Sequence, residues 1–116
     1  MELKIGSDIF QLSHSLRVAY ALQKEHGNKP YMQILETIAD MPIEKQISLL
    51  YISHKVAEPG SPVTQKEFMD MVLDELGLHQ IMDIISELVN SMMYKGLTEE
   101  QIEAVKAKTE GKTTAQ

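Results

Sequence analysis

Cysteine is absent from this chain of 116 residues. Its absence excludes disulfide scaffolds, zinc sites built from thiolates and cysteine nucleophiles. Disulfides belong to oxidising compartments, so a chain without cysteine fits a cytoplasmic setting better than a secreted one.

Long hydrophobic runs are also missing. Charged residues interrupt each apolar stretch within about ten residues, whereas a membrane-spanning helix needs about 20 apolar residues in succession. The N-terminal residues MELKIGSD carry charges and precede no apolar segment of the secretory type. We therefore expect no membrane partner and no secretory signal.

Basic residues are too few for a nucleic-acid partner to be expected. The chain has 11 Lys and Arg against 17 Asp and Glu, a formal net charge of -6. Such a charge repels phosphate backbones, whereas proteins that bind nucleic acids usually present a basic face.

Motifs for catalysis or metal binding are absent as well. There is no P-loop and no G-x-G-x-x-G. The four histidines are not paired at i, i+4, and none follows a Glu at the E-x-x-H spacing of helical metal sites. The acidic pairs Asp70 with Asp74 and Asp83 with Glu87 are expected on solvated helix faces. We predict no catalytic residue, no metal site and no cofactor.

What the sequence does contain is helical patterning. Hydrophobic residues make up 43% of the chain, enough for one domain with one core. The pattern predicts an all-α fold, a compact bundle of five to six short helices. Residues 3–5 could form a short extended arm at its N-terminus. Residues 1–97 form the predicted helical domain. Residues 98–116 are predicted to hold a weak terminal helix and a disordered polar tail, with disorder in the last ten residues.

Capping residues place the expected helix ends in the first half of the chain. Apolar residues at helical spacing predict a first helix from Ile9, capped by Ser7 or Asp8, with a buried stripe formed by Ile9, Leu12, Leu16, Ala19 and Tyr20. This helix is expected to end near Gly27. Pro30 and Pro42 suit the starts of the next two helices.

A proline-containing loop, capping boxes and glycines mark the expected helix ends in the second half of the chain. The prolines of residues 58–62 predict a loop. Thr64 with Glu67 forms a capping box for the next helix, which ends before Gly77. The most strongly patterned helix then runs to Gly96, and a capping-box pair at residues 98 and 101 begins the weak terminal helix.

The segment 64–94 also has the outline of a helix-turn-helix, with Gly77 in the turn. Its second helix offers acids and Gln80 where a recognition helix needs basic or amide groups. The outline alone supports an alternative function, that of a small helical transcriptional or antitermination regulator.

Methionine is concentrated in one stretch. Residues 69–93 hold five of the eight methionines and no lysine or arginine. Methionine fills irregular gaps in cores and also suits surfaces that adapt to varied partners. By their helical positions, three of these residues are predicted to fill the core: Met71, Met82 and Met92. Met69, Met93 and Tyr94 lie off the main stripes and are predicted to bind a partner or a second copy of the chain.

The order of these segments resembles a known family. The segments are MELKIGSDIF, LQKEHGNKPYMQIL, PIEKQISLLYISHKV and TQKEFMDMVLDELGLHQIMDIISELVNSMM, followed by a polar tail. Over about residues 1–97, their order and lengths are similar to those of the small tail assembly chaperones of long-tailed bacteriophages and prophages of Gram-positive hosts.

The resemblance implies a non-enzymatic helper in the cytoplasm of a bacterial host cell. Such a protein coats the long helical tape measure protein during tail assembly and is absent from the finished virion. The tape measure protein is thus the expected partner. A homo-oligomer is also expected, because the apolar surface at Met69 and Met93 suits an interface between copies of the chain.

Overall fold

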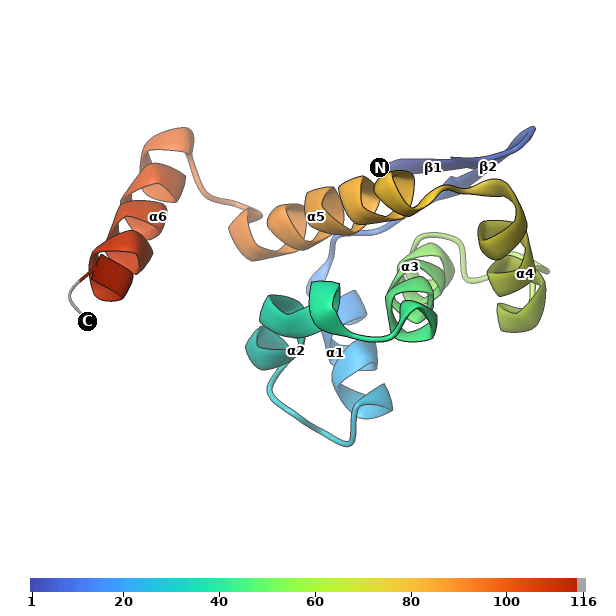
Figure 1. Cartoon of the computed structure of the whole chain (residues 1–116), viewed down its shortest axis with the longest axis horizontal. Coiled ribbons are helices and arrows are strands. Elements are labelled where there is room, and N and C mark those ends of the chain that lie inside the picture. The colour runs from blue at the N-terminus through green and yellow to red at the C-terminus, as the bar shows by residue number, and fades with distance from the viewer. Residues whose placement is uncertain (115–116) are drawn as a thin grey trace.

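The computed structural model describes the backbone of residues 1–114 and the side chains of residues 1–107. A β-hairpin precedes a mostly helical body, as Figure 1 shows. In chain order the elements are β1 (Glu2–Ile5), β2 (Asp8–Gln11), α1 (Leu16–Glu25), α2 (Tyr31–Thr37), the short 3-10 helix η1 (Ile38–Asp40), α3 (Ile43–Ala57), α4 (Gln65–Glu75), α5 (Leu78–Tyr94) and α6 (Glu99–Thr114). The helical bundle predicted from the sequence is confirmed in outline, and the hairpin is an addition to it.

The N-terminal hairpin packs one of its faces against the helices. Its strands are antiparallel, with Leu3 opposite Phe10 and Ile5 opposite Asp8. Gly6 opens the two-residue turn with φ of 61°, the left-handed conformation that tight hairpin turns require at this position. Leu3, Ile5 and Phe10 are buried, and α3 and α4 pack against the strands. The apolar side chains of the hairpin therefore belong to the main core.

The predicted start of the first helix at Ile9 is wrong. Ile9 lies in β2, and α1 begins at Leu16 with Ser15 as its N-cap. The Arg17 amide donates a hydrogen bond of 3.3 Å to Ser15 Oγ. The spacing from Ile9 to Leu16 fits a helix, but it spans a strand and a loop, and pairing with β1 decides the conformation there.

The buried face of α1 differs from the predicted stripe for the same reason. Leu16 and Tyr20 are 66% and 62% exposed, whereas Val18 and Leu22 are fully buried. The predicted stripe continued the helical period from Ile9, so its phase was wrong by the time it reached the true helix.

Helix α3 lies at the centre of the molecule and packs against α1, α4 and β2. It buries residues on most of its circumference, including five in succession from Gln46 to Leu50, two of them polar. A helix enclosed on most sides needs partners for its polar side chains, because an unpaired buried polar group is costly.

His54 of α3 shows how this requirement is met. Its Nδ1 lies 2.9 Å from the Gln11 carbonyl oxygen and its Nε2 lies 2.8 Å from Ser61 Oγ. The ring stacks on Phe68 and meets the edge of Phe10. This histidine therefore joins the hairpin to the loop after α3, a structural role of the kind predicted for the histidines.

The predicted capping boxes are confirmed. The Glu67 amide donates to Thr64 Oγ1 over 3.2 Å, and the Thr64 amide donates to Glu67 Oε1 over 3.2 Å. Thr98 and Gln101 make the same exchange at 3.0 and 3.2 Å, which starts α6. The segment 58–62 between α3 and α4 is non-helical, as its prolines predicted.

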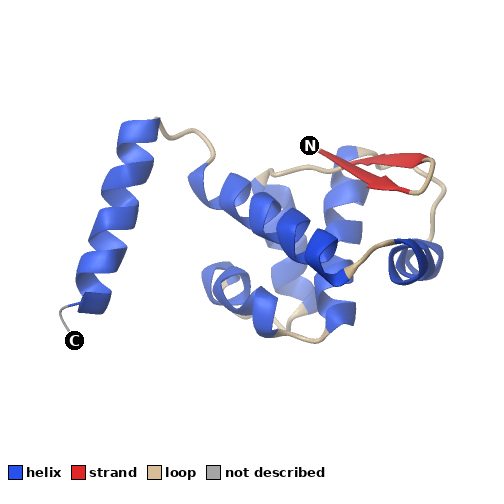
Figure 2. Ribbon diagram, turned by 45° about the horizontal axis from the view of Figure 1, so that its top comes forward, coloured by secondary structure: helices blue, strands red, loops and turns tan. Residues whose placement is uncertain are grey.

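Helix α6 projects away from the rest of the structure, as Figures 1 and 2 show. Residues 95–98 connect it to α5, and Lys106 Nζ lies 5.4 Å from the centre of the Tyr94 ring. The sequence predicted disorder in the last ten residues, but α6 continues as a helix to Thr114. Residues 115 and 116 lie outside the described part of the chain.

Candidate functional site

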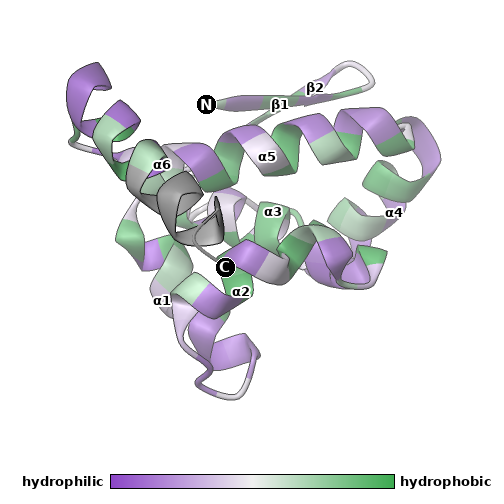
Figure 3. Cartoon of the chain, turned by 60° about the vertical axis from the view of Figure 1, so that its left-hand side comes forward, coloured by the Kyte–Doolittle hydropathy of each residue, from purple (hydrophilic) through white to green (hydrophobic). Residues whose placement is uncertain are grey.

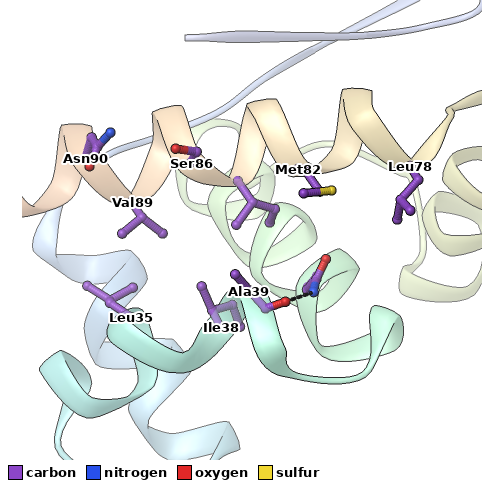
Figure 4. A pocket seen from close by; sticks show the side chains of 10 residues that line it. Leu35, Ile38, Ala39, Leu78, Met82, Ser86, Val89 and Asn90 are labelled. Carbon is purple, nitrogen blue, oxygen red and sulfur yellow. Dashed lines mark hydrogen bonds between the residues drawn. The ribbon is translucent and has the colours of Figure 1, made fainter.

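A groove of about 360 Å³ runs along one side of α5, facing α2 and η1. Its α5 wall consists of Leu78, Met82, Ile85, Ser86, Val89 and Asn90. The opposite wall is formed by Leu35, Ile38 and Ala39, and Gln46 of α3 also lines the groove. Figure 4 shows Leu78, Met82 and Val89 pointing from α5 toward the opposite wall. This feature is called the α5 groove below.

The α5 groove is apolar and open. Ile38 and Ile85 are 2% and 3% exposed and belong to the core, whereas Leu78 and Met82 are 63% and 51% exposed. Figure 3 shows hydrophobic residues along much of α5, with hydrophilic residues between them. Contiguous exposed apolar surface of this kind marks an interaction site more often than isolated exposed side chains do.

A second hollow of about 280 Å³ lies near the C-terminal end of α5. It is lined by residues of α1, α2 and α5, among them Leu16, Tyr31, Met32 and Met93. Leu35 lines this hollow as well as the α5 groove, so the two are neighbours on the same side of the molecule. The apolar surface therefore extends beyond the α5 groove.

The structure does not bring the predicted partner-binding residues together. Met69 lies in α4, which joins the N-terminal end of α5 through the residues before Leu78, while Met93 lies at the other end of α5. Fifteen residues of helix between Leu78 and Met93 span about 22 Å at a rise of about 1.5 Å per residue. Both methionines are partly buried and pack against the core. Met93 contributes to the second hollow, and Met69 does not share its surface.

Tyr94 contacts α6. Its ring lies under the Lys106 ammonium group, and it lines a shallow hollow together with Ile102 of α6. Part of the Tyr94 side chain is therefore already used by the chain itself.

The predicted burial of the other methionines holds for two of three. Met92 is 6% exposed, and Met71 is partly buried against the core. Met82 is not a core residue, contrary to the prediction. It follows the buried Ile81 on the helix, about 100° further round, and lines the open α5 groove.

Gln46 fixes the shape of the floor of the groove. Its Nε2 donates to the Ala39 and Met41 carbonyl oxygens, each over 3.1 Å. These two acceptors determine the orientation of the amide, because a carbonyl oxygen cannot bond to Oε1. Among the residues that the structure describes, no donor bonds to Gln46 Oε1. The side chain is 9% exposed, and its Oε1 is an acceptor in a groove that the polar residues Ser86 and Asn90 also line.

Exposed carboxylates lie on the elements that form the α5 groove. Glu36 and Asp40, beside Leu35 and Ala39 in sequence, are exposed, as are Asp83 and Glu87 of α5. Asp83 and Glu87 lie three residues before Ser86 and Asn90, so they are neighbours of these lining residues on the helix surface. Helices α2, η1 and α5 contain no lysine and no arginine. Glu87 lines a separate shallow hollow with Lys95 and Lys106. The predicted solvation of Asp83 and Glu87 is confirmed.

Other kinds of site find no support within the described residues. In the part of the chain that the structure describes, no group of three or more His, Asp or Glu residues is placed to hold a metal ion. Nor does any described helix combine the length and the apolar character needed to cross a bilayer.

The sequence carries a signal for the α5 groove in the spacing of its apolar residues. Leu78, Met82, Ile85 and Val89 follow one another at intervals of four, three and four residues, which is a row along one helix face. This row lies beside the buried row of Ile81, Leu88 and Met92. The pattern predicts one wide apolar arc, and only the positions of α2 and η1 show which part of it stays open.

Comparison with known proteins finds no matching family model, no similar curated protein and no similar solved structure.

Proposed function

We propose that this chain is a non-enzymatic tail assembly chaperone of a long-tailed phage or prophage, and that it binds the helical tape measure protein through the α5 groove. The order of sequence segments suggests the class of protein. The observation that carries the binding mechanism is the exposure of Leu78 and Met82 on a groove wall that also holds the buried Ile85.

An amphipathic helix suits this surface. Helix-in-groove recognition uses apolar side chains at intervals of three and four residues, and the α5 groove presents its own apolar row at those intervals. Leu35 connects the groove to the second hollow, so a helix lying along α5 could contact both. Met82 and Met93 have flexible side chains that adapt to different apolar residues, as a long client of varied sequence requires.

Many copies on one client would make a modest affinity sufficient. Each bound copy raises the effective concentration of the next contact, so avidity replaces tight single-site binding. For the same reason we propose that the chain works as an assembly of copies on the client.

The alternative, a small helical transcriptional or antitermination regulator, rests on the order α4, Gly77, α5. The exposed side chains of α5 include Asp83 and Glu87 and no lysine or arginine, which disfavours contact with phosphates. Tight, salt-sensitive binding to duplex DNA at low ionic strength would favour this alternative over the chaperone.

Co-expression tests the proposed function. The chain carries an affinity tag and is produced in a bacterial host together with the tape measure protein encoded beside it. We expect the tape measure protein to stay soluble and to copurify with the tagged chain. A tape measure protein that aggregates equally with and without the chain, and never copurifies with it, would refute the proposal.

A further inference from the structure

We propose that two copies of the chain pair about a two-fold axis when no client is present, with α1 of each copy lying in the α5 groove of the other. The pair covers both grooves, and a client helix replaces the partner copy. This competition with a client rests on the proposed function, whereas the pairing itself does not. Copies of the chain thus have a defined contact, and the groove stays closed until a client binds.

One continuous apolar face carries the most exposed hydrophobic side chains. Leu35 lines both the α5 groove and the second hollow, so the two join along α2. Tyr20 follows Leu16 by one helical turn and extends the face over α1. Leu16, Leu78 and Tyr20, at 66%, 63% and 62%, are the three most exposed large hydrophobic residues in the described part of the chain. The exposed members of this surface, called the apolar face below, are Leu16, Tyr20, Tyr31, Met32, Leu78 and Met82.

The apolar face has the area that a stable pair needs. Its six exposed residues are between 40% and 66% exposed. A side chain of this size presents about 200 Å² when fully exposed, so the face leaves about 600 Å² of mostly apolar surface open. A standard interface covers about 800 Å² on each partner, of which about 450 Å² is apolar. The face therefore supplies the apolar part of one side of such an interface.

Charged side chains are nearly absent from the two hollows of this face. Of the residues that line them, only Lys95 is charged, and it lies just beyond the end of α5. The centres of protein interfaces are depleted in charge and enriched in tyrosine and methionine, which here are Tyr31, Met32, Met82 and Met93. The composition suits an apolar protein surface, and pairing through it should persist in high salt.

Helix α1 has the dimensions that the α5 groove accepts. Leu16 and Tyr20 lie one turn apart on its exposed side, a spacing at which helices dock into apolar grooves. The helix has 10 residues and is about 15 Å long. It fits within the stretch of α5 from Leu78 to Asn90 that lines the groove, which is about 18 Å long. A second copy therefore brings an apolar helix of suitable length.

A two-fold axis lets the same contact form twice. Leu35 lies between the α1 end and the groove end of the apolar face, and Figure 4 shows it opposite Val89. An axis through this middle places the α1 end of one copy against the groove end of the other. Leu16 and Tyr20 of each copy then enter the groove of the other, beside Met82. Both apolar ends are covered, so association stops at two copies.

Sedimentation equilibrium tests the pairing. The full chain is measured up to about 200 µM, at low and at high salt, and we expect a monomer–dimer equilibrium with a dissociation constant of about 1–50 µM. This range is weak enough for a client to replace the partner copy, and a chain diluted below it is monomeric with an open groove. We expect salt to change the constant by less than about threefold, because no charged residue lines the groove. A chain that stays monomeric throughout, or forms assemblies larger than dimers, would overturn the pairing.

Three single substitutions locate the contact. Tyr20→Glu places a charge on α1, Met82→Lys places one in the groove, and Leu73→Lys on α4 is the matched control, at a side chain that is 50% exposed. All three positions are exposed, so the variants should fold, which circular dichroism checks. We expect the first two to weaken dimerisation at least about tenfold, because each buries an unpaired charge, and the control to leave it unchanged. Equal weakening by all three would overturn the site.

A mixture of the two weakened variants tests the geometry. When one Tyr20→Glu copy pairs with one Met82→Lys copy, one of the two contacts is unchanged and the other sets the new glutamate beside the new lysine. We expect the mixture to form a one-to-one dimer at concentrations where each variant alone is monomeric. A mixture that also stays monomeric would show that α1 does not lie in the groove of the other copy.

Copurification of the tape measure protein separates the pairing from the proposed function. Tyr20→Glu removes the competing copy and leaves the lining of the α5 groove intact, so it should retain at least as much tape measure protein as the unchanged chain. A lower amount would contradict the competition. If the chain pairs as expected but never retains the tape measure protein, the proposed function fails and the pairing stands. If it retains that protein but is always monomeric, the proposed function stands and the pairing is wrong.

Discussion

Gln46 donates a hydrogen bond of 3.1 Å from its Nε2 to the Ala39 carbonyl oxygen, and this contact ties α3 to the end of η1. The same nitrogen also bonds to the Met41 carbonyl oxygen. One buried side chain thus holds the short segment between α2 and α3 in place. That segment is one wall of the α5 groove, so the shape of the groove depends on a polar contact as well as on apolar packing.

Gln46→Leu should therefore destabilise the chain. The substitution removes both hydrogen bonds and leaves two carbonyl oxygens without their donor, a loss of about 1–3 kcal/mol in the free energy of unfolding. Urea denaturation followed by circular dichroism measures it. Gln33→Leu on the exposed side of α2 is the matched control and should change stability by less than about 0.5 kcal/mol. Equal effects of the two substitutions would contradict the role given to Gln46.

His54→Leu should lower the free energy of unfolding more than substitution of a histidine at the surface does. It leaves the Gln11 carbonyl and the Ser61 hydroxyl without their partner and removes a ring stacked on Phe68. We expect a loss of about 2–3 kcal/mol and earlier protease cleavage in the hairpin. His79→Leu, at an exposed position of α5, serves as the control. If both variants unfold at the same urea concentration, His54 does not anchor the hairpin.

Met92 and Met82 lie in different environments on α5, so substitution by alanine should lower the free energy of unfolding at Met92 and hardly change it at Met82. Met92 is 6% exposed, so Met92→Ala leaves a cavity and should cost about 2–5 kcal/mol. Met82 is 51% exposed, and Met82→Ala should leave the free energy of unfolding within about 0.5 kcal/mol of the original value. Chemical denaturation measures the free energy of unfolding of both variants. A large loss for Met82→Ala would mean that the α5 groove is closed in solution.

Helix α6 should be separable from the body of the protein. Residues 95–98 link it to α5, and among its described side chains Lys106 contacts the Tyr94 ring. Limited proteolysis should first cut in this linker, because exposed and weakly held segments open at low cost. A chain ending at residue 97 should then unfold within a few degrees of the full chain. A large drop in its melting temperature would show that α6 contributes to the core.

Much of the helical architecture could be predicted because its signals are local. The capping box at Thr64 and Glu67 and the glycine before Leu78 set helix ends through their immediate neighbours. The hairpin could not be predicted in this way, because Ile9 fits a helical spacing until Leu3 and Phe10 pair across the turn. That pairing is a tertiary preference that overrides the local pattern.

The position of the α5 groove could not be predicted from the sequence. A methionine-rich apolar surface was expected, and the structure has an open apolar groove, but on Leu78 and Met82 in place of Met69. Periodicity shows how wide an apolar arc is. It does not show where neighbouring helices stop covering it, because that depends on how α2 and η1 pack against α5. Gln46 gave no signal at all, since nothing in the sequence near it indicates that its amide closes η1.

The most direct test of the account compares two lysine substitutions in the copurification of the tape measure protein. Met82→Lys places a charge in the α5 groove, and Leu73→Lys places one on α4, at a side chain that is 50% exposed where Met82 is 51% exposed. Circular dichroism should show that both variants fold. The account predicts that Met82→Lys loses the tape measure protein and that Leu73→Lys retains it. Retention by both folded variants, or loss by Leu73→Lys alone, would contradict binding through the α5 groove.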